Sequence, residues 1–124
     1  MKKRFTLEEA NNLLPLLQPL LGQLLEHQAR LATLYRPIQP LLRQAALNVG
    51  SADTTQLTVE MMAIEKLSAE IRSYGCLLKD IKVGLIDFLS EQDGREVYLC
   101  WRYGELEITH YHLLEEGFSE RRLI

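Results

Sequence analysis

A helical repeat of leucines that continues through four prolines limits the folds open to this chain more than any other feature. At about 100° per residue, the apolar residues of this stretch fall in one sector of a helix. They are Leu13, Leu17, Leu20, Leu24, Leu31, Tyr35, Ile38, Leu42 and Val49, and Leu14, Leu16, Leu21 and Leu25 widen the sector. The prolines, at positions 15, 19, 37 and 40, project to the opposite side.

The prolines decide between a broken and a bent helix. A proline in a helix interior costs about 3 kcal/mol, which favours a break. A break normally resets the helical phase, however, and here the phase is kept. Thr6 and Glu9 form a capping box that starts the helix. We therefore predict one bent helix from Leu7 to Leu47, with its prolines facing solvent. A split near Arg36 and Pro37 is the alternative.

A second helix is predicted to pair with the first. Residues 48–52 are typical of a turn, and Asp53 with Gln56 forms another cap pattern. Gly75 suits the end of a helix that runs to about Tyr74. The expected buried stripe of this helix is Leu57, Met61, Ile64, Ser68 and Ile71. The two helices would form an antiparallel hairpin.

The unequal lengths of the two helices predict a partner. The first helix would be about 60 Å long and the second about 32 Å, at 1.5 Å per residue. One short helix cannot cover such a long and broad apolar face. The excess must pack on the rest of the chain or on another copy, so we expect a homodimer formed through the first helix.

Composition indicates one small globular protein. A chain of 124 residues can bury its own core, and we expect a single domain over 1–124. The net charge of −3 argues against a nucleic-acid partner, which usually requires a basic face. No apolar run approaches the ~20 residues of a membrane span, and no export pattern follows the basic start. Cys76 and Cys100 have no paired spacing, so we expect reduced thiols in the cytoplasm.

The chain changes from helical to β character after Gly75. Short β-like runs lie on either side of a turn at 80–84, and Asp93–Gly94 marks another turn. Residues 97–102 and 107–113 form the strongest predicted hairpin. The predicted fold is α+β, a long antiparallel helical hairpin followed by a small antiparallel β-sheet. Its parts are the helical hairpin at 7–75, the β-hairpins at 76–113 and a C-terminal tail at 114–124.

The last hairpin carries most of the chemically reactive residues. With Gly104–Glu105 as a two-residue turn, Arg102 faces Glu107 and can form an ion pair with it. Cross-strand partners share a face of the sheet. One face then carries Val97, Leu99, Trp101, Ile108, His110 and His112. The other carries Tyr98, Cys100, Arg102, Glu107, Thr109 and Tyr111.

His110 and His112 raise the question of a metal site. Two imidazoles on one face of a strand can chelate zinc, with a third ligand from Glu105 or from Glu115 and Glu116. The simpler interpretation is that both rings pack at the rim of the sheet and bond to backbone or carboxylates. We therefore expect no cofactor, with a divalent metal such as zinc as the alternative.

Cys100 and Arg102 allow two further interpretations. As a nucleophile, Cys100 would need a base within hydrogen-bond reach, and in this register both histidines point to the other face. A one-residue shift would reverse that, because the side-chain period is two; we expect an inert, buried thiol. Arg102 can grip an anionic ligand, although pairing with Glu107 or Glu105 is the simpler interpretation. Trp101 is expected to anchor the core.

Motifs spread over nearly the whole chain resemble one known family. They are Thr6 to Asn11, Leu13-Leu14-Pro15, Lys79-Asp80, Gly84-Leu85 with Asp87-Phe88, Cys100-Trp101-Arg102 with Gly104-Glu105, Tyr111-His112, Gly117-Phe118 and Arg121. The family is the uncharacterised bacterial domain of unknown function family DUF 2203, which usually has Trp where Tyr111 stands and a small residue where Glu120 stands. The resemblance implies no activity. It directs attention to Arg102, Glu105 and His112, and less to His110.

These observations name no reaction. We expect a non-catalytic protein that self-associates or acts as an adaptor through its leucine-rich first helix. The alternative is a metal- or small-ligand-binding protein, or an enzyme, with a site on the C-terminal hairpin. That site would use Arg102, Glu105 and His112 for a ligand, or His110, His112 and Glu105 for a metal.

Overall fold

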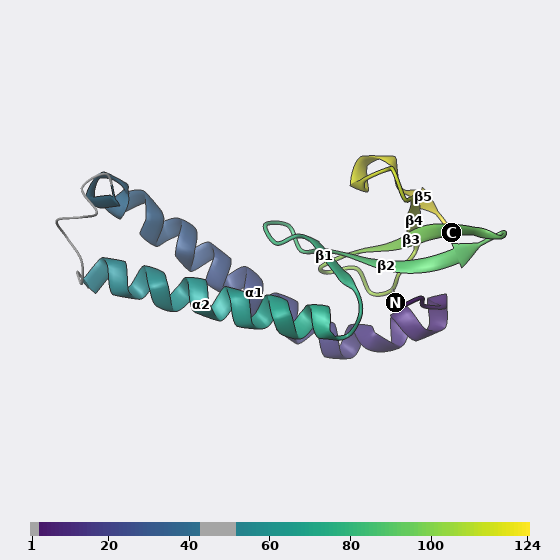
Figure 1. Cartoon of the computed structure of the whole chain (residues 1–124), viewed down its shortest axis with the longest axis horizontal. Helices are drawn as coiled ribbons and strands as arrows, with labels where there is room; N and C mark the ends of the chain where they lie inside the picture. Colours follow the sequence, from purple (N-terminus) through teal and green to yellow (C-terminus); the bar gives the residue numbers. More distant parts are fainter. Residues whose placement is uncertain (1–2, 43–51) are drawn as a thin grey trace.

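The computed structural model describes residues 3–42 and 52–124, without the side chains of 35–42 and 52–54. Two helices, α1 (Leu7–Leu42) and α2 (Ala52–Ser73), form a hairpin and precede a five-stranded sheet. The strands are β1 (Leu77–Asp80), β2 (Leu85–Gln92), β3 (Arg95–Arg102), β4 (His110–Leu113) and β5 (Arg122–Leu123), with a 3-10 helix η2 (Phe118–Glu120) before β5. This is the predicted α+β arrangement (Figure 1).

The first helix is continuous across all four prolines. It begins with the predicted capping box, in which Thr6 N–H donates to Glu9 Oε1 at 2.8 Å and Glu9 N–H donates to Thr6 Oγ1 at 3.1 Å. The first two prolines are exposed, as the helical phase requires. The alternative split at Pro37 is not found. The predicted end of the helix at residues 43–47, the turn after it and the buried sector beyond Leu34 lie outside the described residues.

The first part of α1 is buried against one face of the sheet. The core combines Ala10, Leu14, Leu17, Leu21 and Leu24 of α1 with Ile86, Phe88, Leu99, Trp101 and Ile108. Figure 1 shows this part of α1 lying beneath the sheet, while the rest of α1 and most of α2 project beyond it. Leu16, predicted in the buried sector, is exposed because it lies about 120° around the helix from the centre of the buried stripe.

The buried face of α2 differs from the predicted stripe. Leu57, Ser68 and Ile71 are buried as expected, but Met61 is exposed and Glu60 is buried instead. Glu60 accepts hydrogen bonds from residues of α1, and a buried polar contact of this kind is invisible to a hydrophobic pattern. The predicted cap was also wrong, because α2 begins at Ala52 and Asp53 lies inside it.

The sheet is an antiparallel meander in chain order, β1-β2-β3-β4-β5. The predicted hairpin around residues 80–84 joins β1 to β2. The predicted turn at Asp93–Gly94 joins β2 to β3, and both residues have positive φ, 53° and 78°, as a type I′ hairpin turn requires. No helix in the described ranges is long and apolar enough to cross a membrane.

The pairing of β3 with β4 differs from the prediction by one residue. Cys100 faces His110 and Tyr98 faces His112, whereas the prediction placed Thr109 and Tyr111 there. Because the side-chain period of a strand is two, this shift moves every side chain of β4 to the other face. Both histidines therefore share the face of Cys100, and the predicted separation of the thiol from the imidazoles was wrong.

A wide loop at residues 103–109 replaces the predicted two-residue turn. Trp101 Nε1–H donates to the carbonyl oxygen of Glu105 at 2.9 Å and folds the loop back onto the core. Asn11 of α1 accepts the N–H of Ile108 through Oδ1 at 2.8 Å. In both bonds one partner is a side chain from outside the loop, Trp101 on β3 or Asn11 on α1. They hold the loop open, so Arg102 and Glu107 are not cross-strand partners.

The residues after β4 form part of the sheet layer. β5 pairs with β4, and Ile124 N–H donates to the carbonyl oxygen of Thr109 at 2.9 Å. Between β4 and β5 the chain passes over the face of the sheet that points away from the helices (Figure 1). Residues 114–121, here called the C-terminal cover, form the first part of the predicted C-terminal tail and lie over this face of the sheet.

Candidate functional site

Three adjacent strands bring Asp87, Cys100 and His112 together on the outer face of the sheet. Asp87 of β2 is the direct cross-strand partner of Cys100 on β3, and His112 lies on β4 opposite Tyr98. Asp87 and His112 are each 2% exposed and Cys100 is 1% exposed. One oxygen, one sulfur and one nitrogen of these side chains lie within 4.8 Å of one another. No other such group of three potential metal ligands occurs among the described residues.

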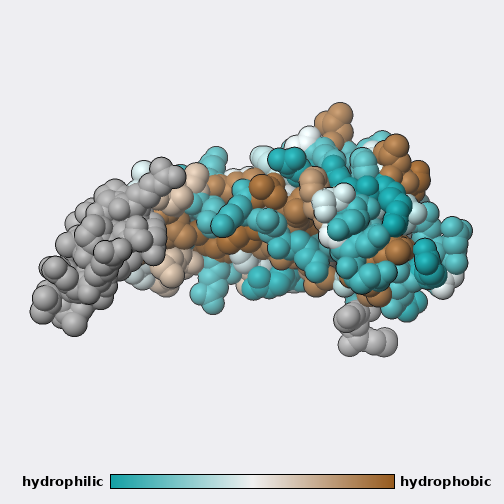
Figure 2. All heavy atoms as spheres, turned by 90° about the horizontal axis from the view of Figure 1, so that it is seen from above, coloured by the Kyte–Doolittle hydropathy of each residue, from teal (hydrophilic) through white to brown (hydrophobic). Residues whose placement is uncertain are grey.

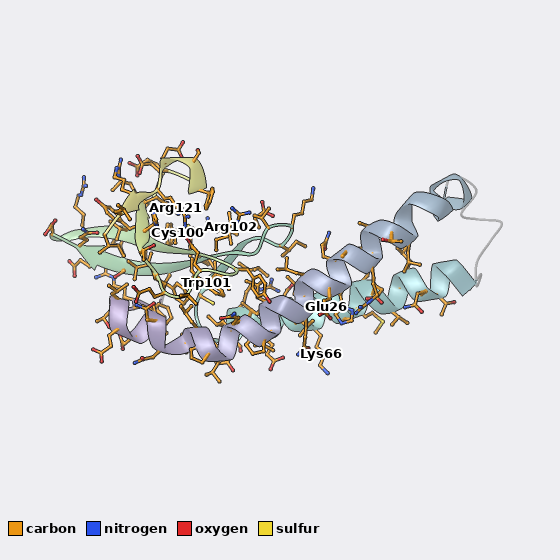
Figure 3. All side chains as sticks on the ribbon, turned by 180° about the vertical axis from the view of Figure 1, so that it is seen from behind. Glu26, Lys66, Cys100, Trp101, Arg102 and Arg121 are labelled. Carbon is orange, nitrogen blue, oxygen red and sulfur yellow. The ribbon has the colours of Figure 1, made fainter. Side chains whose placement is uncertain are left out.

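The C-terminal cover closes this group from solvent. A cavity of about 110 Å³ lies beside the three side chains and is also lined by Lys79, Leu85, Glu116, Gly117 and Phe118. Figure 3 shows Cys100 and Arg121 on the outer side of the sheet and Trp101 on the helix side. The polar side chains on the outer face of the sheet are therefore buried, because the C-terminal cover lies over them.

A buried hydrogen bond joins Asp87 to His112. The carbonyl oxygen of Leu113 lies 2.8 Å from His112 Nδ1 and can only accept, so Nδ1 carries a hydrogen. His112 Nε2 lies 2.9 Å from Asp87 Oδ2, and a hydrogen bond there needs one further proton between the two groups. Burial raises the pKa of Asp87, although His112 and Lys79 oppose the rise.

Cys100 is held as a neutral thiol in this environment. Burial, and after it the charge of the nearby Asp87 carboxylate, raises its pKa to about 12, although Arg121 acts in the opposite direction. A thiol with so high a pKa is a poor nucleophile at neutral pH, because the thiolate is the reactive form. This agrees with the expectation of an inert thiol, although the reason is charge and burial rather than distance from a histidine.

Arg121 and Glu105 form an ion pair at the edge of the group. Arg121 donates from Nη1 and Nη2 to the two carboxylate oxygens of Glu105 at 3.2 and 2.9 Å. Burial opposes ionisation of Glu105, yet the hydrogen bonds from Arg121 and from the N–H of Arg102 outweigh it, so its pKa is lowered. The Arg121 guanidinium also lies 4.3 Å from the ring centre of Phe118. This pair fixes the C-terminal cover to the loop after β3.

A comparison with protein families identifies the chain at this point. The family described as "Uncharacterized conserved protein (DUF2203)" matches residues 3–124. The chain belongs to the DUF2203 family. No curated protein and no solved structure matches it. The resemblance seen in the motifs is therefore confirmed over essentially the whole DUF2203 protein, and the family description names no activity.

Two of the three predicted ligand-binding residues are in contact, because the N–H of Arg102 donates to Glu105 Oε1 at 2.7 Å, but their charged side chains do not pair. In the DUF2203 protein, Glu105 binds Arg121, whereas Arg102 points over the ring of Phe118 at 5.8 Å. Arg102 forms no ion pair with any described residue, and the predicted pair with Glu107 is absent. His112 belongs to the buried group instead.

The predicted metal set also differs from the observed group. His110 lies on the same face as His112, but its Nδ1 is hydrogen bonded to Thr109 Oγ1 at 2.9 Å. The observed group replaces His110 and Glu105 with Asp87 and Cys100.

Two residues of this site, Asp87 and Arg121, were missed as site residues by reasoning from the sequence. Asp87 stands in the middle of the apolar run Leu85–Leu89, and a carboxylate in a buried strand needs a polar partner. That conflict was visible in the sequence and points to a buried polar site. Arg121 gave no comparable pattern, because its role depends on the path of the C-terminal cover.

Proposed function

We propose that this DUF2203 protein is a non-catalytic, self-associating or adaptor protein, and that its interface is the helical arm formed by residues 26–42 and 52–66. The arm includes the second half of the leucine-rich first helix. One observation carries the proposal: Val59, Met61 and Met62 on α2 are 52%, 54% and 66% exposed. Val59 and Met62, three positions apart, are neighbours on one face of α2, and exposed apolar side chains that lie together are typical of protein–protein interfaces.

The arm consists of only two helices, which pack on each other. The described core ends at Leu24 on α1 and Leu67 on α2, so beyond these residues the helices pack on each other and not on the sheet. Figure 2 shows apolar atoms exposed along the arm. A groove of about 400 Å³ also lies there, lined by Ala29, Arg30, Thr33, Leu34, Gln56 and Glu60. A further helical layer would bury these surfaces.

A second copy of the chain fits this requirement. Two arms related by a twofold axis would form a four-helix bundle, in which each arm supplies the layer that the other lacks. The first half of α1 offers less apolar surface for this contact, because Leu14, Leu17, Leu21 and Leu24 are already buried in the core. We therefore propose a dimer contact farther along the first helix than its leucine pattern alone predicts.

The proposal is tested by the mass of the protein in solution. Met62→Glu should convert a dimer into a monomer, because it places charge in the apolar contact. Sedimentation velocity at micromolar concentration measures the change. Leu106→Glu is the matched control: Leu106 is 98% exposed in the loop before β4, so its substitution should leave the dimer intact. A wild-type protein that is monomeric throughout the micromolar range would sink the proposal.

A substitution such as Leu24→Glu is unsuited to this test, although Leu24 belongs to the leucine sector. Leu24 is completely buried, so a charged residue there would disrupt the fold, and a change of mass could not be assigned to the dimer contact. We also propose that the chain forms a single domain over residues 1–124 and that it is cytoplasmic. Cys76 and Cys100 are both free and buried, which suits a reducing compartment.

A further inference from the structure

We infer that Asp87, Cys100 and His112 form a binding site for a divalent transition metal of the zinc type. This site is independent of the helical arm and uses the outer face of the sheet. The three side chains offer oxygen, sulfur and nitrogen, the donor atoms that zinc accepts in proteins. Thiolate and imidazole ligands disfavour magnesium and calcium, which take oxygen ligands.

The spacing of the donor atoms suits a tetrahedral ion. Bond lengths of 2.0–2.3 Å to such a metal place its ligands roughly 3.5 Å apart. The Asp87 and His112 atoms lie 2.9 Å apart, and all three donor atoms lie within 4.8 Å of one another. The required separation falls between these two distances, so small side-chain rotations suffice. Each ligand sits on a different strand of one sheet, which holds its position firmly.

The hydrogen bonds of His112 are those of a metal-ligating histidine. Its Nδ1–H donates to the carbonyl oxygen of Leu113, which fixes the ring orientation and directs Nε2 toward Asp87. Metal-bound imidazoles almost always donate their second N–H to a carbonyl or carboxylate in this way.

Charge and space at the site also fit an ion. The Asp87 carboxylate and a Cys100 thiolate together balance a divalent cation, and Glu105 neutralises Arg121, the nearest guanidinium. Three protein ligands leave a fourth position open, as in catalytic zinc sites. The adjacent cavity of about 110 Å³ has room for about three waters at ~30 Å³ each. Water or a small anion beside Lys79 can therefore complete the coordination.

Metal binding must displace the proton of the Cys100 thiol, because zinc binds the thiolate. Calorimetry in buffers of different ionisation enthalpy should therefore detect proton release when Zn²⁺ binds at neutral pH.

The direct test uses the full chain, purified without a polyhistidine tag. After loading with Zn²⁺ and dialysis, elemental analysis should find about one ion per chain. Bound Co²⁺ should give the charge-transfer absorption of a thiolate ligand. Cys100→Ser should abolish that absorption, whereas Cys76→Ser and His110→Gln should retain it. Less than ~0.1 ion per folded chain, or an absorption that survives in Cys100→Ser, would overturn the inference.

Asp87→Asn tests Zn²⁺ binding in a variant that should still fold. The amide can donate to His112 Nε2 and so replace the native hydrogen bond, and it removes a buried carboxylate. We expect this variant to fold and to melt at or above the temperature of the metal-free protein. Its affinity for Zn²⁺ should fall at least tenfold. Unchanged affinity in Asp87→Asn would remove Asp87 from the site. None of these measurements depends on whether the arm forms a dimer.

Discussion

Glu60 is a buried carboxylate that joins the two helices of the arm. It is hydrogen bonded to His27 Nδ1, and its Oε1 accepts from Arg30 Nε at 3.0 Å and from Gln56 Nε2 at 3.1 Å. The bond to His27 and the contacts with Arg30 lower the pKa of Glu60 against the effect of burial. One residue thereby fixes the register of α1 against α2 through polar contacts.

The lowered pKa makes the arm sensitive to acid. A carboxyl group whose folded pKa is depressed stabilises the fold above its unfolded pKa of about 4.3, and that stability is lost as the pH falls through the folded value. The wild-type protein should therefore lose more stability between about pH 5 and about pH 3 than Glu60→Gln does. Urea denaturation across this range measures the difference. Glu65→Gln, at an exposed site of the same helix, should behave like the wild type; parallel curves for all three proteins would contradict this role of Glu60.

At the scale of elements, the loop at residues 103–109 decides which side chains meet. The contact of Asn11 with the buried N–H of Ile108 spans 97 positions of sequence. Asn11→Ala should lower the free energy of unfolding by about 1–3 kcal/mol, because the N–H loses its partner. Asn12→Ala is the control, since Asn12 is exposed on the same helix turn and its substitution changes helix propensity equally. Equal unfolding free energies for the two variants would show that the contact contributes nothing.

This loop also marks the limit of prediction from sequence. The helices, their hairpin and the turns at 80–84 and 93–94 follow from local patterns, since apolar spacing, caps and glycines act over a few residues. The β3–β4 register does not, because Trp101 and Asn11 impose it from outside the loop. Because the predicted register was wrong by one residue, every side chain of β4 was assigned to the wrong face of the sheet, and the predicted site was wrong with it. Arg121 joined that site only through the fold, whereas the position of Asp87 inside an apolar run already indicated a buried polar group.

At the scale of the whole molecule, the sheet with the first half of α1 forms a deep core, and the arm has two layers. Backbone amides of the arm should therefore exchange with deuterium faster than those of β2 and β3, because local opening exposes less apolar surface there. If the arm is the dimer contact, its exchange should accelerate on dilution while that of the sheet stays constant. Mass spectrometry of peptides covering residues 57–64 and 86–101 measures both. Uniform exchange that does not change with concentration would contradict this division.

The edges of the sheet bear on how copies of this chain avoid aggregation. An exposed edge strand is a template for pairing with a neighbour's strand. Here β1 is short, carries Lys79 and has an irregular register between Leu78 and Asp80. At the other edge, β5 has only two residues, one of them Arg122. Short, bulged and charged edges disfavour strand addition. Uncontrolled growth through the sheet is thereby disfavoured at both edges, and in the proposed dimer the contacts between copies are left to the helices, where association can close on itself.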